Sequence, residues 1–237
     1  MKRAWVLYVG FFVILFTVYL LYVSNAFDFA APKLDVINDK VQRFSFVNQN
    51  GKKITERDVE GKVYVTEYFF TTCRGICPKM NANMRRVYDA FKNEPDFMIL
   101  SHTCMPETDS VPLLKKYEDK MLNGSLIKGN DGVYTVFYDS AQQKSPVINT
   151  TWNFVTGDKS ELYKMARYSY LIDNNKSDTT GKIEDQFIHT QFFALLDKQT
   201  SVRGIYDGLK EDEIEKLIGD IKSLLKETKP TRSLKGF

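Results

Sequence analysis

The chain has 237 residues, of which 33 are lysine or arginine and 30 are aspartate or glutamate, so its formal net charge is +3. A balance this even excludes the clustered positive charge that nucleic-acid binding needs, and we expect no nucleic-acid partner. The length suits one globular domain with an added segment, and the 14% share of aromatic residues is typical of a packed chain rather than a disordered one.

The N-terminal segment predicts a membrane anchor. Residues 4–23 carry no charged side chain, and this run has about the length that a helix needs to cross a bilayer. Residues 24–26 (Ser-Asn-Ala) fit a signal-peptide cleavage site, but the apolar run is longer than the ~7–15 residues of a signal sequence, so we predict an uncleaved anchor. Lys2 and Arg3 precede the run and favour a cytoplasmic N-terminus. The rest of the chain is then exported, into the periplasm if the source is bacterial.

Composition divides the chain into four parts. We expect the anchor at residues 1–26, a linker at 27–43, a folded domain at 44–226 and a flexible tail at 227–237. Within the domain, residues 122–151 are rich in Gly, Asn, Asp and Ser between short apolar stretches. This composition predicts an insertion of loop and hairpin character.

The first half of the domain predicts a hairpin followed by alternating strands and helices. Asn50-Gly51 is a tight-turn pair, preceded by alternating apolar and polar residues. Residue types and apolar spacing then predict, in order, a strand at 63–70, a helix with Pro78 in its first turn, a strand at 97–103 and a helix near 111–117. This order is typical of a parallel α/β unit. We expect Met80 and Met84 to fill the core rather than bind metal.

The second half of the domain predicts a helix, a hairpin and a final helix. Asp158 and Glu161 have the spacing of a capping box, for a helix through about Tyr170. Two apolar runs, at 192–196 and 202–206, predict a hairpin. The last helix is indicated by apolar residues at helical spacing, namely Ile214, Leu217, Ile218, Ile221, Leu224 and Leu225.

A cysteine pair carries the strongest chemical signal. Cys73 and Cys77 lie four positions apart where a predicted strand meets a predicted helix. The positive end of that helix, together with Arg74, is expected to favour the thiolate form. Thiolates select Cu(I) and also accept Zn(II). A structural disulfide is the other interpretation of such a pair in an exported domain.

Four segments together resemble the SCO/SenC family, whose members help deliver copper to cytochrome c oxidase. They read YFFTTCRGICPKM, SHTCMPETDSVPLLKKY, WNFVTGDKSELYKMAR and FIHTQFFALLDKQTSVRGIYDG. The resemblance extends over about residues 44–225. It implies a thioredoxin-like α/β fold, with a central mixed sheet flanked by helices. It also implies one copper ion, bound by Cys73, Cys77 and His189.

The resemblance implies a metallochaperone that delivers copper to, or assembles the copper centre of, a respiratory cytochrome c oxidase. Its partner would be the copper-bearing subunit of that oxidase or another copper acceptor. The alternative is a thiol-disulfide oxidoreductase that reduces partner cysteines with Cys73 and Cys77 as its catalytic residues. Dithiol exchange needs no third ligand, so His189 distinguishes the two. A peroxidase would need a single peroxidatic thiolate and fits the paired cysteines poorly.

The chain departs from the family pattern at three places. Many members have proline where this chain has Arg74, aspartate where it has Ile188, and aspartate-proline where it has Met105-Pro106. Without those acids, the groups that orient His189 must come from elsewhere. The preference between Cu(I) and Cu(II) is therefore open.

Two further residues lie near the motif without belonging to it. Cys104 follows a strand that should neighbour the one ending at the cysteine pair, so its loop approaches the site. We expect this thiol to be buried and inert. His102 lies within the same predicted strand, and we expect it to be packed rather than a ligand.

The anchor prediction has a direct test. Reporter domains fused after Asn25 should be active only outside the cytoplasm, because Lys2 and Arg3 keep the N-terminus inside. N-terminal sequencing of the mature protein should recover the first residues. A soluble exported form that begins near Phe27 would contradict the anchor.

Overall fold

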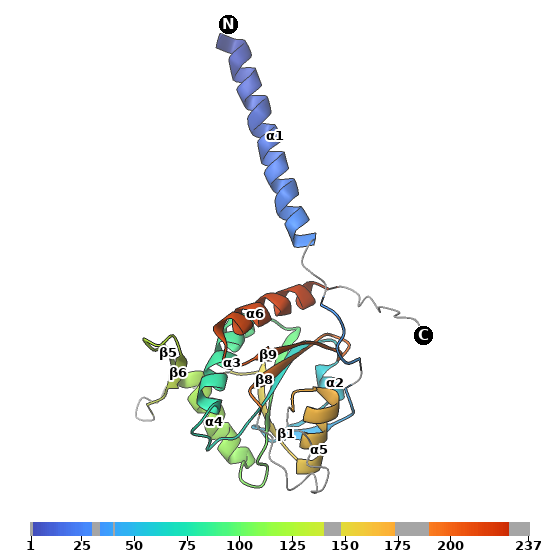
Figure 1. The fold of residues 1–237 in the computed structure, drawn as a ribbon, viewed down its shortest axis with the longest axis vertical. Helices are drawn as coiled ribbons and strands as arrows, with labels where there is room; N and C mark the ends of the chain where they lie inside the picture. The colour runs from blue at the N-terminus through green and yellow to red at the C-terminus, as the bar shows by residue number, and fades with distance from the viewer. Residues whose placement is uncertain (1, 30–33, 40, 140–147, 174–189, 228–237) are drawn as a thin grey trace. The chain divides into compact units, whose positions relative to one another are not determined.

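The computed structural model describes residues 2–29, 34–39, 41–139, 148–173 and 190–227 (Figure 1). The chain divides into two units, Met1–Leu34 and Asp35–Phe237. The first unit holds helix α1 (Lys2–Phe29), within which Trp5–Tyr22 is long and apolar enough to cross a membrane.

The second unit is built on a seven-stranded sheet of order β2-β1-β7-β4-β3-β8-β9. Its strands are β1 (Ser45–Asn48), β2 (Lys53–Thr55), β3 (Val63–Phe69), β4 (Phe97–Thr103), β7 (Trp152–Thr156), β8 (Phe192–Leu196) and β9 (Val202–Asp207). The helices are α2 (Glu56–Val59), α3 (Cys77–Phe91), α4 (Val111–Asn123), α5 (Lys159–Lys164), a π-helical turn (Met165–Ser169) and α6 (Glu211–Lys226).

Strands β3 and β4 lie inside the sheet and run parallel. Their register extends from Val63 opposite Phe97 to Phe69 opposite Thr103. β4 is also parallel to β7, whereas β1, β2, β8 and β9 join the sheet by antiparallel pairing. The predicted central strand and the predicted strand–helix alternation are confirmed. Because parallel strands end at the same edge of a sheet, the loops after Phe69 and Thr103 are neighbours.

Both faces of the sheet are covered by helices. α3, α4 and α6 lie against one face, and α2 and α5 lie against the other (Figure 1). All seven residues of β3 are consequently buried. Alternate side chains of β3 point to opposite faces: the Phe69 ring packs 5.0 Å from that of Tyr117 on α4, and the Tyr68 hydroxyl donates to the Leu162 carbonyl on α5.

The helix that follows the cysteine loop packs as the sequence predicts. α3 has Pro78 in its first turn, where a missing N–H costs no hydrogen bond. Met80 and Met84 are fully buried, which confirms them as core residues. On the other side of the sheet, the Asp158 side chain accepts a hydrogen bond from the Glu161 N–H at 2.9 Å and caps α5. The α-helical part ends at Lys164, and the π-helical turn continues it.

One strand was missed from the sequence. β7 lies between β1 and β4, and Trp152 and Phe154 are fully buried in it. It follows the loop-rich stretch of residues 122–151 and has only 5 residues, so its own apolar pattern is a weak signal. Its conformation is fixed by pairing with Ile99 to His102 of β4, which are about fifty residues away in the sequence. Short helix α2 was also not predicted.

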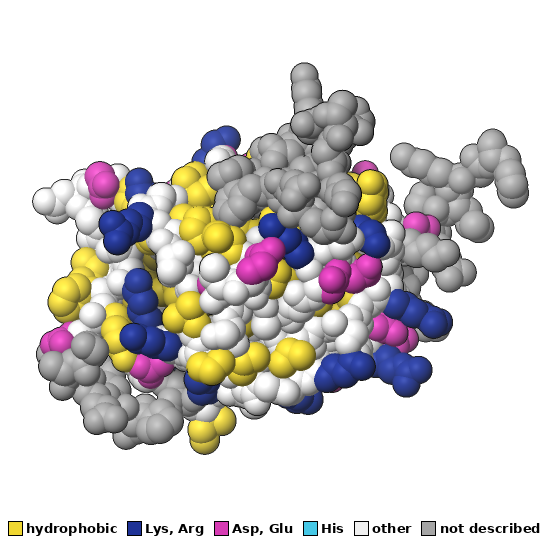
Figure 2. Space-filling model, turned by 90° about the horizontal axis from the view of Figure 1, so that it is seen from below, with side chains coloured by type: hydrophobic (Ala, Val, Ile, Leu, Met, Phe, Trp, Pro, Cys, Tyr) yellow, Lys and Arg dark blue, Asp and Glu magenta, His cyan; other side chains and the backbone are white. Residues whose placement is uncertain are grey.

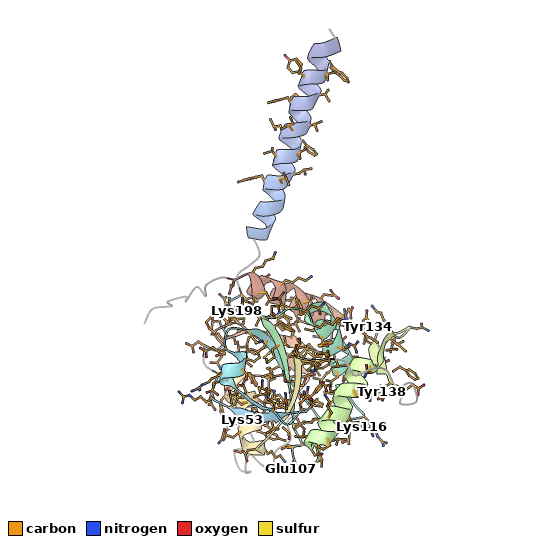
Figure 3. All side chains as sticks on the ribbon, turned by 180° about the vertical axis from the view of Figure 1, so that it is seen from behind. Lys53, Glu107, Lys116, Tyr134, Tyr138 and Lys198 are labelled. Carbon is orange, nitrogen blue, oxygen red and sulfur yellow. The ribbon has the colours of Figure 1, made fainter. Side chains whose placement is uncertain are left out.

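The predicted insertion does contain a hairpin. β5 (Ser125–Lys128) and β6 (Tyr134–Phe137) pair with each other and form a separate sheet. Arg86 of α3 lies 4.3 Å from the centre of the Tyr134 ring and also pairs with Glu211 of α6, so the turn end of the hairpin, where Tyr134 pairs with Lys128, is held near both helices. Tyr134 and Tyr138 lie on the α4 side of the domain in Figure 3. Residues 140–147 lie outside the described residues.

The C-terminal elements agree with the sequence prediction. β8 and β9 form the predicted hairpin, with Thr200 at φ 64° in its turn. α6 buries one face, made of Ile214, Leu217, Ile221 and Leu224. On the face of the protein shown in Figure 2, acidic and basic side chains are interspersed. The predicted tail lies largely outside the described residues.

A buried acid lies beneath α3 and α4. Glu67 of β3 is fully buried, and its Oε1 accepts a hydrogen bond from the Ser101 hydroxyl at 2.6 Å. The Trp152 indole N–H donates to the same hydroxyl oxygen at 2.8 Å, whereas Oε2 of Glu67 has no partner among the described residues. Burial raises the pKa of Glu67 to about 8, against the opposing effect of the Ser101 hydrogen bond. The folded protein therefore holds this carboxyl group in its neutral form near pH 7.

Glu67→Gln should change how stability depends on pH. Between pH 4.5 and about 8 the unfolded chain releases the Glu67 proton and the folded chain retains it, so wild-type stability falls as pH rises. The slope from one such group is about 1.4 kcal/mol per pH unit. The glutamine variant lacks this loss, so its stability relative to wild type should increase from pH 5 to pH 8. Urea unfolding over that range measures the difference.

Glu60→Gln is the matched control, because Glu60 is exposed. Its unfolding curve should follow that of the wild type at every pH. A constant difference between Glu67→Gln and the wild type across the range would show that Glu67 is ionised in the folded protein.

Candidate metal centre

The cysteine pair lies at the junction of β3 and α3. The Cys73 N–H donates to the Phe70 carbonyl at 3.2 Å, which turns the chain directly after β3. Cys77 is the first residue of α3, whose first turn is closed by hydrogen bonds from Lys79 and Met80 to the Ile76 carbonyl, both 3.0 Å. The loop between strand and helix is thus fixed at both ends.

The two thiols share one cavity of about 350 Å³. Cys73 is half-buried, Cys77 is 5% exposed, and their side chains are close enough to hydrogen-bond. The walls are largely apolar, made by Tyr68, Phe69, Phe70 and Ile76, and are completed by Arg74, Gly75, Cys104 and Thr190. All three cysteines are free thiols. A structural disulfide between Cys73 and Cys77 is therefore not present.

Burial dominates the chemistry of Cys77. It raises the pKa of the Cys77 thiol, and the hydrogen bond with Cys73 raises it further. The Arg74 side chain is exposed. The prediction that the helix terminus and Arg74 favour the thiolate form is therefore wrong for Cys77, because the loss of hydration on burial outweighs the effect of these charges. A metal ion that binds here must displace the Cys77 proton.

Cys104 lines the same cavity from the end of β4. It is 2% exposed, and its N–H and its thiol both donate to the Phe69 carbonyl, at 2.9 Å and 3.3 Å. Burial, with the nearby Asp109 carboxylate, raises the pKa of Cys104 to about 12. These findings confirm that the thiol is buried and that its loop approaches the site. In the described part of the chain, no three His, Cys, Asp or Glu side chains converge to hold a metal ion.

His102 is a packed core residue, as predicted. Its ring is fully buried and stacks 5.0 Å from Tyr68, with Phe46 and Tyr170 each 5.4 Å away. Its Nδ1 is hydrogen-bonded to the Thr66 hydroxyl at 3.0 Å. Burial lowers the pKa of His102 to about 3, so the ring is neutral. It lies behind the cavity wall formed by Tyr68.

His189 and Ile188 lie outside the described residues, so the third ligand stays a prediction. The chain resumes at Thr190, which is 4% exposed and lines the cavity. The structure thus brings Cys73, Cys77 and the residue after His189 together.

Sequence analysis missed one residue of this site, Asp109. Its buried carboxylate accepts hydrogen bonds from Thr71, in the cysteine loop, and from Thr103, at the end of β4. An acid just before a predicted helix is usually read as a helix cap, which hides this role.

A mixed sheet with covered faces and a cysteine pair between β3 and α3 defines a thioredoxin-like dithiol domain. The SCO1/SenC family profile matches residues 34–128 and 138–226, and the chain belongs to that family. The profile leaves out residues 129–137, which include all of β6. The turn and second strand of the hairpin therefore lie outside the family's matched regions, whereas β5 lies within them.

Relatives cover most of the chain. The SCO1 protein homolog of Bacillus subtilis is 29% identical over 191 residues, which are 80% of this chain and 84% of the relative. The solved structure of BsSco, described as having a disulfide switch and as a member of the Sco family of cytochrome c oxidase assembly proteins, is 28% identical, with a TM-score of 0.59 over 81% of this chain and 96% of its own. Bradyrhizobium japonicum ScoI, solved with copper bound, shares the fold at 18% identity, with a TM-score of 0.53 over 77% of this chain and 98% of its own.

Cys104→Ser should leave the metal content of the purified chain unchanged. Cys104 lines the cavity but does not converge with Cys73 and Cys77 on one point. Elemental analysis after expression with copper and zinc both present measures the content, and Cys77→Ser serves as the variant that should lose metal. A loss of half or more in Cys104→Ser would show that its sulfur is a ligand.

Proposed function

We propose that this chain is a membrane-anchored copper chaperone for a respiratory cytochrome c oxidase. It binds one copper ion through Cys73, Cys77 and His189 and delivers it to, or assembles, the oxidase copper centre. The observation that carries this proposal is the pair of adjacent free thiols in a largely apolar cavity of a SCO1/SenC family chain.

The donor set fits copper better than zinc. Two thiolates and an imidazole suit three-coordinate Cu(I), whereas structural zinc usually has four protein ligands. Among the described residues, Cys104 shares the cavity with the cysteine pair, but no third metal-binding side chain converges with the pair on one point. A closed four-ligand zinc site would need two ligands from outside the described residues. His189 is the only histidine in that part of the sequence.

The position of Thr190 supports His189 as the third ligand. Thr190 is buried and lines the cavity that holds both thiols. Consecutive Cα atoms are about 3.8 Å apart, so a side chain on the residue before Thr190 is within reach of the cavity.

The cavity rim is suited to transfer. Cys73 is half-buried, whereas Arg74, Gly75 and Ile76 beside it are exposed. A partner thiol or imidazole can therefore approach copper from the Cys73 side and replace one ligand at a time. The likeness to Sco proteins supports the copper-bearing subunit of cytochrome c oxidase as this partner, or another copper acceptor.

A membrane anchor supports a partner that is itself bound to the membrane. Helix α1 is long and apolar enough to span a membrane. Lys2 and Arg3 support a cytoplasmic N-terminus, and the copper domain is then exported, on the periplasmic side in a bacterium. A single span would hold the domain close to a membrane-bound oxidase.

The second candidate is a thiol-disulfide oxidoreductase that reduces partner cysteines. It is favoured by the hydrogen-bonding contact between the Cys73 and Cys77 thiols, the two groups that would form the disulfide. The half-buried Cys73 would attack the partner disulfide, and Cys77 would release the reduced partner. The disulfide switch of BsSco is consistent with such chemistry.

His189→Ala separates the two functions. It should weaken Cu(I) affinity by at least tenfold, because a two-coordinate ion exchanges more readily, and should leave dithiol reduction of a model disulfide unchanged. Cys73→Ser and Cys77→Ser should abolish both. Competition with a chromophoric Cu(I) chelator measures affinity.

His189→Gly provides the internal control, because added imidazole should restore its copper affinity. If His189→Ala binds copper as tightly as the wild type, the chaperone loses its third ligand. The oxidoreductase then becomes the better account.

A further inference from the structure

A buried carboxylate joins the two loops that carry the cysteines. Asp109 lies between β4 and α4 and is fully buried. Its Oδ1 accepts the Thr71 hydroxyl at 2.6 Å, and its Oδ2 accepts the Thr71 N–H at 3.2 Å and the Thr103 hydroxyl. Thr71 lies two residues before Cys73, and Thr103 directly precedes Cys104.

These contacts indicate an ionised Asp109. All three groups on its oxygens are donors, and an ionised carboxylate is the form that only accepts. Within the described residues, no lysine or arginine forms an ion pair with it. Its charge is therefore held by hydrogen bonds, next to the cavity, without a paired cation.

The nearest charges do not cancel that of Asp109. Lys159 lies near Cys104, but its ammonium pairs with Glu107 at 3.1 Å. Glu107 is at the periphery of the domain, where water screens it (Figure 3). Lys159 is half-buried and acts on Cys104 in the opposite direction to Asp109, but its effect is the smaller one, so the buried carboxylate dominates beside Cys104.

We propose that Asp109 sets the oxidation-state preference of copper in this site, and that its fixed negative charge favours Cu(II) over Cu(I). The proposal rests on the copper function proposed above. Reduction adds one electron to Cu(II) and breaks no bond, so the ion loses one unit of positive charge. A buried anion nearby stabilises the more positive ion by the larger amount, because the protein interior screens charge weakly.

Asp109 brings a charge to the β4–α4 loop, whereas Met105 in the same loop does not. Met105, the first loop residue of the β4–α4 connection after Cys104, carries no charge. Asp109 lies four positions further on, close enough to Cys104 to act on it, and is hydrogen-bonded to Thr71 and Thr103. It is a positioning residue for both loops and a source of charge, and these two effects can be separated by substitution.

The test is the reduction potential of copper in the full-length, copper-loaded chain, titrated with ascorbate and followed by the electron paramagnetic resonance signal of Cu(II). Asp109→Asn keeps the shape and removes the charge. It should lower the ratio of Cu(II) to Cu(I) affinity about tenfold, which raises the potential by about 59 mV for a one-electron couple. Thr103→Val removes two hydrogen bonds, the one to Asp109 and the one from the Met105 N–H, and keeps the charge, so its potential should stay near that of the wild type.

Asp96→Asn is the matched control. Asp96 precedes the other end of β4, is exposed, and pairs with Lys198 at 3.2 Å. Its substitution makes the same change of charge far from the cavity and should leave the potential unchanged. Equal potentials in Asp109→Asn and Asp96→Asn would overturn the proposal, as would an equal shift in Thr103→Val, which would assign the effect to geometry.

A fallback covers the case in which Asp109→Asn does not fold. Lys159→Gln removes a cation near Cys104 and should lower the potential, the opposite direction. An unchanged potential in that variant would overturn the proposal. Failure of the wild type to bind copper at all would instead contradict the proposed function, so the two failures are distinguishable.

Discussion

The parallel pairing of β3 with β4 is the constraint on which the site depends. Seven consecutive residue pairs hold these strands in register, and both strands end at the same edge of the sheet. The Cys104 N–H continues the pairing by donating to the Phe69 carbonyl at 2.9 Å. Two loops distant in sequence are thus neighbours, and one cavity collects the cysteines of both. A slip of this register would separate Cys104 and Thr103 from the cysteine loop without changing any local element.

Buried acidic side chains in this domain differ in their protonation state. Glu67 accepts one hydrogen bond, from Ser101, and is held neutral, whereas Asp109 accepts three and is suited to the ionised form. Cys77 is held as a thiol by the same removal from water. Because the thiolate is the reactive form, this burial lowers the reactivity of Cys77.

The elements whose own residues show a clear pattern could be predicted from the sequence alone. The aromatic and β-branched run of β3, the helical spacing of α3 and the β8–β9 hairpin are read from neighbouring residues, and all are confirmed. β7 could not be read in this way, because Trp152 becomes a strand residue through pairing with Ile99. Asp109 was missed for the same reason, since Thr71 and Thr103 reach it only in the folded chain. The ionisation of Cys77 was misjudged because burial depends on packing. His189 came from family resemblance and not from a physical pattern.

The account rests on two sulfurs and one imidazole nitrogen binding the same copper ion. X-ray absorption at the copper edge of the full-length chain loaded with one equivalent of Cu(I) tests this directly. We expect two sulfur scatterers and one nitrogen scatterer with the outer-shell pattern of an imidazole. Three sulfurs would mean that Cys104 replaces His189, and two sulfurs alone would mean that the thiols act without a third ligand; either result would contradict the account.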